Sequence, residues 1–240
     1  MKRFTFILIS FIILTLFSCT SKDRTIHIEG KLSHCSFSKI YLYKVSPDGE
    51  SMIDSSVIKN GVFSLKDKVN KDQIQRTSPS FYKLYFSETN LILTIASIGE
   101  KLHFEARADS LVKTYKVTGG KEALLVHELD MQLKCFIDSV ETLYFLYEQN
   151  RYNDSLKIGI ETEYNQLVSN HKTFLKSFIQ KNKGSLATLT AFYQSFNRRI
   201  FLPEEENISL LKEILMQIKM KYPKNENILF IESRIENYSN

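Results

Sequence analysis

Two patterns of apolar positions divide the chain. From Thr25 to Thr118, apolar and polar residues mostly alternate over short runs, which is the period-two pattern of half-buried β-strands. From residue 119 to Asn240, apolar residues recur every three or four positions, which is typical of amphipathic helices. The pair Gly119-Gly120 marks the change. The pattern therefore predicts an α+β protein with a β-domain at residues 25–118 and a helical domain at residues 119–240.

The β-domain is expected to contain about eight short strands. Asn60-Gly61, between two alternating runs, is a strong signal for a β-hairpin, and Pro47-Asp48-Gly49-Glu50 predicts a turn. Residues 66–80 are polar and rich in charge, so we expect a loop there. The predicted strands cover residues 26–32, 40–45, 52–58, 62–65, 81–86, 91–95, 101–106 and 113–117. Strands of this number and spacing favour an antiparallel β-sandwich or a partly open barrel.

The second half predicts a bundle of about five helices. Asn153-Asp154-Ser155 offers good N-caps, and Lys183-Gly184-Ser185 is expected to end one helix and cap the next. Pro203, followed by three glutamates, predicts a helix start, and Tyr222-Pro223 predicts its end. The apolar stripes of the expected helices span residues 125–147, 160–178, 186–196, 211–218 and 228–235.

The first nineteen residues have the pattern of a bacterial secretory signal. Met1-Lys2-Arg3 is basic, residues 4–17 form an apolar run of 14 residues, and Leu16-Phe17-Ser18-Cys19 resembles a lipobox. A membrane-spanning helix needs about 20 apolar residues, so a retained transmembrane anchor is the weaker alternative. We predict a signal peptide at residues 1–18, lipidation of Cys19, and a polar tether at residues 19–24.

This signal places the mature protein in the bacterial cell envelope. We expect a lipid-anchored protein on the periplasmic side of the outer membrane or on the cell surface, and Lys22-Asp23 in the tether is a candidate signal for surface routing. The other alternative is ordinary cleavage near Ser18 or Thr20, which would release a soluble secreted protein.

Composition excludes some function classes. The formal net charge of +5 falls to +3 when Lys2 and Arg3 leave with the signal peptide, and neither half is strongly basic, so nucleic-acid binding is not expected. The chain has 12 Tyr and 17 Phe but only 8 Gly and 4 Pro, which indicates a globular protein with a core.

No motif for catalysis, metal or cofactor binding is present. His127-Glu128-Leu129-Asp130-Met131 begins like a zinc metalloprotease motif, but it has methionine where the second histidine is required. Gly119-Gly120-Lys121 lacks the upstream glycine and the following Ser/Thr of a phosphate loop. His171 lies on an apolar helical face, so we interpret it as a buried, hydrogen-bonded core residue. We therefore expect no cofactor, no metal and no catalytic residue, although folding can bring distant residues together.

Cysteines and aromatic residues leave alternatives open. Cys35 and Cys135 could pair in an oxidising compartment, but we favour two buried small apolar residues, and no Cys-x-x-Cys is present. Two aromatic clusters either fill the core or bind a glycan or a partner. These clusters are Phe81, Tyr82, Tyr85 and Phe86, and Tyr144, Phe145 and Tyr147.

The order of several short motifs resembles a known arrangement. These motifs are residues 28–32 (IEGKL), 40–43 (IYLY), 54–65 (DSSVIKNGVFSL), 81–84 (FYKL) and 115–120 (YKVTGG). They resemble the β-rich domain of unknown function at the amino terminus of lipoprotein thiol–disulfide oxidoreductases of the TlpA/AhpC-TSA thioredoxin-like group. The helical half resembles the linker region of those proteins. In that group a thioredoxin-like domain with a Cys-x-x-Cys site follows, whereas this sequence reaches Asn240 without that motif.

The resemblance and the lipobox together favour a non-catalytic function. We expect a membrane-anchored envelope lipoprotein that serves as an interaction or positioning module for an envelope protein partner. One alternative is a truncated or split oxidoreductase that acts with a separate thioredoxin-like domain. A second alternative is a lipoprotein that binds a glycan or another small ligand.

Overall fold

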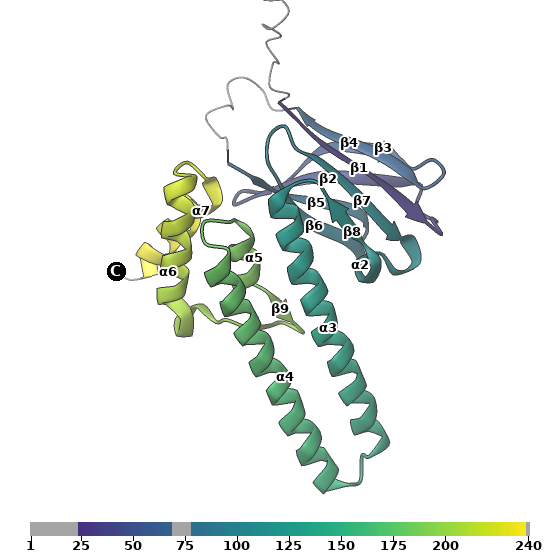
Figure 1. Ribbon diagram of the computed structural model, residues 1–240, viewed down its shortest axis with the longest axis vertical. Coiled ribbons are helices and arrows are strands. Elements are labelled where there is room, and N and C mark those ends of the chain that lie inside the picture. The colour runs from purple at the N-terminus through teal and green to yellow at the C-terminus, as the bar shows by residue number, and fades with distance from the viewer. Residues whose placement is uncertain (1–23, 69–77, 239–240) are drawn as a thin grey trace, which may run out of the picture.

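The computed structural model describes residues 24–68 and 78–238 (Figure 1). The predicted signal peptide, Cys19 and tether residues 19–23 lie outside the described residues. Strands occupy the amino-terminal part and helices the carboxy-terminal part, so the predicted α+β class is confirmed. All eight predicted strands of the β-domain are present, and they form two sheets of four.

The first sheet has the order β4-β1-β7-β8 and the second has the order β3-β2-β5-β6. The first sheet consists of β1 (Thr25–Ser33), β4 (Val62–Lys68), β7 (Lys101–Arg107) and β8 (Lys116–Thr118). The second consists of β2 (Lys39–Ser46), β3 (Gly49–Val57), β5 (Ser80–Ser87) and β6 (Asn90–Ala96). The sheets do not close into a barrel. The strands of the two sheets pair antiparallel, as predicted, except β1 and β7, which pair in parallel.

Alternation along the strands produces the sandwich core. In β4 the burial pattern alternates strictly, with Phe63 and Leu65 buried between exposed neighbours. Ile28 and Leu102 face inward from the same sheet, and Leu84 faces them from the second sheet. Burial of these apolar surfaces, at about 25 cal/mol per Å², holds the two sheets together.

A tight turn joins the two sheets at β3 and β4. Asn60 and Gly61 both have positive φ, 52° and 76°, as the predicted hairpin turn requires. A Cβ on Gly61 would lie 2.1 Å from the carbonyl oxygen of Leu32, so only glycine fits there. Beyond this turn, side chains link the two strands: Asp54 Oδ2 accepts a hydrogen bond from the backbone N–H of Lys66 at 2.8 Å.

Two predictions in the β-domain need correction. The predicted strand 113–117 is shorter, because α2 (Leu111–Thr114) precedes β8 and buries Leu111. Thr114 Oγ1 accepts a hydrogen bond from the N–H of Arg107 at 3.0 Å and so stabilises this helical turn. The predicted loop 66–80 is also shorter, because β4 continues to Lys68 and β5 begins at Ser80. Residues 69–77 lie outside the described part.

The five predicted helices are present. They are α3 (Lys121–Gln149), α4 (Asp154–Lys181), α5 (Ala187–Phe192), α6 (Glu204–Lys221) and α7 (Glu226–Tyr238). Asn153 caps α4 as predicted, and its side chain accepts a hydrogen bond from Leu156 N–H at 3.1 Å. The predicted helix 186–196 ends early, at Phe192, because β9 (Ser195–Phe196) and β10 (Arg199–Ile200) form a small hairpin there.

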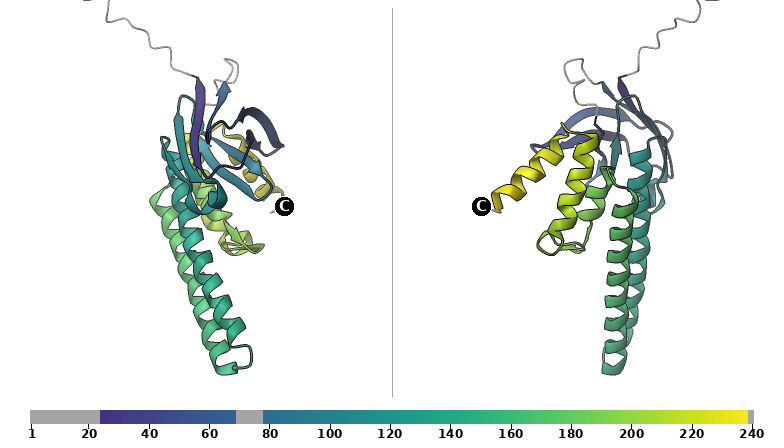
Figure 2. Two further views of the ribbon diagram at one scale, coloured as in Figure 1. Left: turned by 90° about the vertical axis from the view of Figure 1, so that its right-hand side faces the viewer. Right: turned by 60° about the vertical axis from the view of Figure 1, so that its left-hand side comes forward.

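The helices do not form a regular bundle. α3 and α4 make a long antiparallel hairpin that extends away from the sheets, as both views in Figure 2 show. Its 29-residue first helix spans about 43 Å. α3 begins against β6 and β8, and α5, α6 and α7 pack beside the base of the hairpin. Within the described residues, no helix is long and apolar enough to cross a membrane.

Candidate functional site

A cavity of about 410 Å³ lies where the second sheet meets the helices. Residues of β2, β5 and β6 form one wall, and residues of α3, α7 and the segment from α5 to Gln194 form the others. Most of the lining is apolar. The apolar lining residues are Val45, Phe81, Leu93, Ile95, Val126, Leu133, Leu189 and Ile231.

Strand register explains this apolar wall. Val45 pairs with Phe81 across β2 and β5, and Phe81 pairs with Ile95 across β5 and β6. These three residues therefore share the face of the second sheet that is opposite to Tyr82 and Leu84, which point into the sandwich. The helices cover this outer face, and Ile95 is fully buried in the helical core. The second sheet is thus apolar on both faces near the cavity.

Asp130 is the charged residue of the cavity lining. It lies on α3 and is half-buried, and its Oδ2 accepts a hydrogen bond from the Tyr115 hydroxyl at 2.5 Å. Burial raises the pKa of Asp130 to about 6, although the Tyr115 hydrogen bond and the nearby His127 act in the opposite direction. His127 Nε2 is 2.8 Å from the carbonyl oxygen of Tyr115. This contact helps to hold Tyr115 in the position from which its hydroxyl reaches Asp130.

The remaining polar groups of the lining are mostly satisfied by protein partners. Gln194 Oε1 is 2.7 Å from His171 Nε2, and the Tyr193 hydroxyl donates to Glu204 at 2.8 Å. Thr94 is different. Its side chain is buried, 2% exposed, and its Oγ1 has no hydrogen-bond partner among the described residues. A buried hydroxyl without a partner costs about 1–3 kcal/mol.

The prediction for His171 is confirmed. Its ring is buried against Phe136 and Phe201, with centroids 5.0 and 4.5 Å away, and it is hydrogen-bonded to Gln194. Desolvation lowers the pKa of His171, so the neutral form is favoured. His171 therefore orients Gln194 beside the cavity and acts as a core residue.

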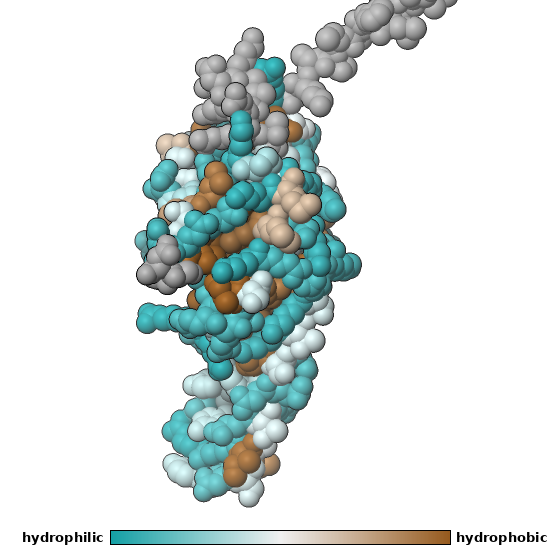
Figure 3. Space-filling view, turned by 90° about the vertical axis from the view of Figure 1, so that its left-hand side faces the viewer, coloured by the Kyte–Doolittle hydropathy of each residue, from teal (hydrophilic) through white to brown (hydrophobic). Residues whose placement is uncertain are grey.

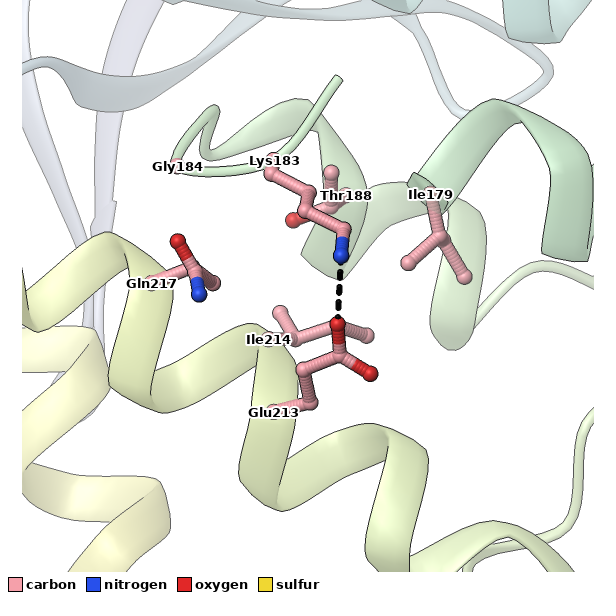
Figure 4. Close-up of a pocket in the computed structure, with 7 residues that line it drawn as sticks. All are labelled: Ile179, Lys183, Gly184, Thr188, Glu213, Ile214 and Gln217. Atoms are coloured by element: carbon pink, nitrogen blue, oxygen red, sulfur yellow. Dashed lines mark ion pairs between the residues drawn. The ribbon is translucent and has the colours of Figure 1, made fainter. Parts of the chain in front are cut away.

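A second hollow lies between α4, α5 and α6, but it is too small for a ligand. Its volume of about 10 Å³ is at most the size needed for one water molecule. Figure 4 shows Lys183 and Glu213 pointing toward each other across it, with their charged atoms 2.8 Å apart. The Lys183 hydrogen bond lowers the pKa of Glu213, as expected for an ion pair that joins two segments. We interpret this hollow as a structural joint.

The cysteine prediction is partly wrong. Cys35 is half-buried near the start of β2, but Cys135 is exposed on α3, and both are free. Part of the first aromatic cluster belongs to the core, since Tyr82 and Phe86 are buried. No group of three or more His, Cys, Asp or Glu residues suited to a metal ion occurs in the described ranges.

The second aromatic cluster is exposed at the far end of the α3–α4 hairpin. Tyr144 and Phe145, at the end of α3, are 65% and 61% exposed, and Ile158, early in α4, is similarly exposed. The charges at this end are paired: Arg151 with Glu148, and Lys157 with Asp154. We call Tyr144, Phe145, Tyr152 and Ile158 the hairpin tip.

Sequence reasoning missed Asp130. One signal for Asp130 was available, because Val126, Asp130 and Leu133 are spaced four and three residues apart and so share one helical face. A carboxyl group on an apolar stripe predicts either a buried partner or a binding site.

These features define a two-layer β-sandwich that carries a helical hairpin, with a cavity at the junction. The family model described as a domain of unknown function (DUF4369) matches residues 26–125 of the chain. The match covers the β-domain and the first turn of α3, and therefore includes one wall of the cavity. A search of curated proteins found no significant match.

Proposed function

We propose that this protein is a lipoprotein of the bacterial envelope, held by acyl chains on Cys19, whose folded body is a non-catalytic interaction or positioning module. The Leu16-Phe17-Ser18-Cys19 pattern carries the first part of the proposal. Acyl chains contribute about 0.8 kcal/mol for each buried CH₂, so several chains on one cysteine would hold the protein permanently.

The direction of the hairpin supports a positioning role. β1 begins at one end of the long axis of the molecule, and the hairpin tip lies at the other end (Figure 1). With a lipid on Cys19, the sheets would lie near the membrane and the tip would extend away from it. Because the charges at the tip neutralise each other, a protein partner with an apolar surface fits it better than an anionic membrane or a nucleic acid.

The chemical state of the amino terminus tests the proposed lipid anchor. Mass spectrometry of the protein from membranes should show an acylated Cys19 as the first residue, and Cys19→Ala should abolish acylation and leave an unprocessed chain. An unacylated amino terminus in the wild-type protein would contradict the anchor.

The partner role is tested by cross-linking at the hairpin tip. A photo-cross-linking amino acid at Phe145 should form one defined adduct in intact cells. The same amino acid at Lys172, an α4 position nearer the sheets, is the control and should not form it. Equal adducts at both positions would contradict docking through the tip.

The resemblance to thiol–disulfide oxidoreductases supports a second candidate, in which the body acts with a separately encoded thioredoxin-like domain. The match to the domain of unknown function is consistent with it but names no activity. DNA sequence downstream of the gene that encodes a Cys-x-x-Cys domain would favour this candidate. Disulfide reductase activity of the purified protein that is lost in Cys35→Ser or Cys135→Ser would contradict the non-catalytic proposal.

A further inference from the structure

We propose that the cavity between the second sheet and helices α3, α5 and α7 binds a small apolar molecule that bears one amine, with the ammonium group against Asp130. This inference rests on the geometry of the cavity and does not depend on how the chain is attached to a membrane.

The size and walls of the cavity fit such a molecule. A volume of about 410 Å³ lies within the range of small-molecule sites, roughly 300–1,000 Å³. The cavity is open at its rim, because Leu93 is 48% exposed and Asn227 is half-buried. Figure 3 shows the side of the molecule where α6 and α7 lie, and apolar surface gathers there between polar areas above and below.

The charge of the cavity lining determines which polar group a ligand can carry there. Asp130 brings a carboxyl group to the lining, and neither lysine nor arginine is among the lining residues. Its Oδ2 is occupied by the Tyr115 hydroxyl, but among the described residues no donor reaches Oδ1. An ammonium group would supply the missing donor and the opposite charge, whereas a carboxylate ligand would be repelled.

The hydroxyl of Tyr193 cannot replace Asp130 in this role, because it already bonds Glu204 and Arg234. Thr94 does not add a second polar contact, because it pairs with Tyr82 across β5 and β6 and its side chain therefore points into the sandwich. Asp130 is thus the group of the lining that recognises the amine.

The cost of Asp130 to the fold supports a binding role. Burial raises the pKa of this carboxyl group, which means that its charged form is under-solvated in the folded protein. A carboxyl group that served only the fold would gain more donors, as Glu122 does elsewhere on the same helix. Groups that cost stability are typical of sites that are completed by a ligand.

The experiment compares three probes that differ only in the polar end: 3-phenylpropylamine, 3-phenylpropan-1-ol and 3-phenylpropanoate. Their binding to the full chain in lipid nanodiscs is measured by equilibrium dialysis at neutral pH, and empty nanodiscs correct for partition into lipid. We expect the amine to bind at least about tenfold more tightly than the alcohol, and the carboxylate to bind most weakly.

Two matched variants on α3 locate the effect. Asp130→Asn should remove the preference for the amine and leave the affinity for the alcohol within about twofold. Asp138→Asn, an exposed acid on the same helix outside the cavity, should leave all three affinities unchanged. The proposal is overturned if no probe binds saturably, if the amine preference survives Asp130→Asn, or if Asp138→Asn removes it equally. Should Asp130→Asn fail to fold, the relative affinities of the three probes for the wild-type chain still test the proposal. Equal affinities would overturn it.

Discussion

Two acidic residues on the same helix have opposite surroundings. Glu122, in the first turn of α3, is buried, and its Oε2 accepts hydrogen bonds from Ser185 Oγ at 2.6 Å and from the Ala187 N–H at 3.1 Å. Asp130, about two turns further on, has a single donor and a pKa raised to about 6. The first acid joins α3 to the start of α5, and the second faces a cavity. Glu122 therefore stabilises the fold, whereas Asp130, with its single donor, is the acid that we propose to bind a ligand.

The largest effect is expected from Glu122→Ala. This change leaves the Ser185 hydroxyl buried without its acceptor and leaves the Ala187 N–H with only Ser185 Oγ, 3.2 Å away. A buried donor that loses its acceptor costs about 1–3 kcal/mol. We expect the free energy of unfolding, measured with urea, to fall by about 3 kcal/mol. Glu122→Gln keeps an acceptor oxygen and should lose less than half of that. A loss under about 0.5 kcal/mol for Glu122→Ala would show that the contacts of Glu122 with Ser185 and Ala187 do not stabilise the fold.

Asp130→Asn should raise the free energy of unfolding at neutral pH, whereas Glu122→Ala lowers it. Because the folded-state pKa of Asp130 is about 6, above its unfolded value of about 3.9, the folded protein holds the proton more tightly. The contribution of Asp130 to stability therefore falls as pH rises from about 4 to about 6, and the penalty is complete above that range. At neutral pH the asparagine variant should be more stable by about 1–2 kcal/mol. The readout is the difference between the two proteins in urea unfolding at several pH values, and a difference that does not change with pH would be contrary to this prediction.

Thr94→Val tests an unsatisfied buried group on the sandwich face of β6. Valine has nearly the same shape and removes the buried hydroxyl that has no partner. We expect the free energy of unfolding to rise by about 1 kcal/mol, because the cost of burying that hydroxyl disappears. Thermal unfolding measures the change. A loss of stability would mean that the hydroxyl is satisfied in the protein, for example by a bound water molecule.

The smallest effect on stability is expected at the hairpin tip. Phe145 is 61% exposed, so Phe145→Ser should change the free energy of unfolding by less than about 0.5 kcal/mol. The same variant should reduce cross-linking from a probe at Tyr144 if the tip binds a partner. A large loss of stability would instead place Phe145 in a core contact and remove the basis for a docking role.

Local chemistry made much of the fold predictable. The alternation in β4, the Asn60-Gly61 turn and the Asn153 cap each act over a few residues, and the structure contains all three. The parallel pairing of β1 with β7 was not predictable in this way, because it joins residues more than 70 positions apart. The early end of α5 was also not predictable, because the β9–β10 hairpin that follows it interrupts the helical spacing of apolar residues.

The candidate site was harder to predict than the fold. Its walls come from strands and helices that meet only in the folded chain, and Phe81 and Ile95 share a face through strand register. Asp130 was visible as an acid on an apolar stripe, but its role depends on which donors reach it in three dimensions. Tyr144 continues the helical spacing of Phe136 and Val140, and only the length of the hairpin shows that it is exposed.

The central position of β1 has a mechanical consequence. β1 is paired over seven positions with β4 on one side and over seven with β7 on the other. If the amino end is fastened to a bilayer, any force on the protein enters through this strand. Pulling it out requires two rows of hydrogen bonds to break at once, so the first strand after the attachment point is also well suited to withstand tension.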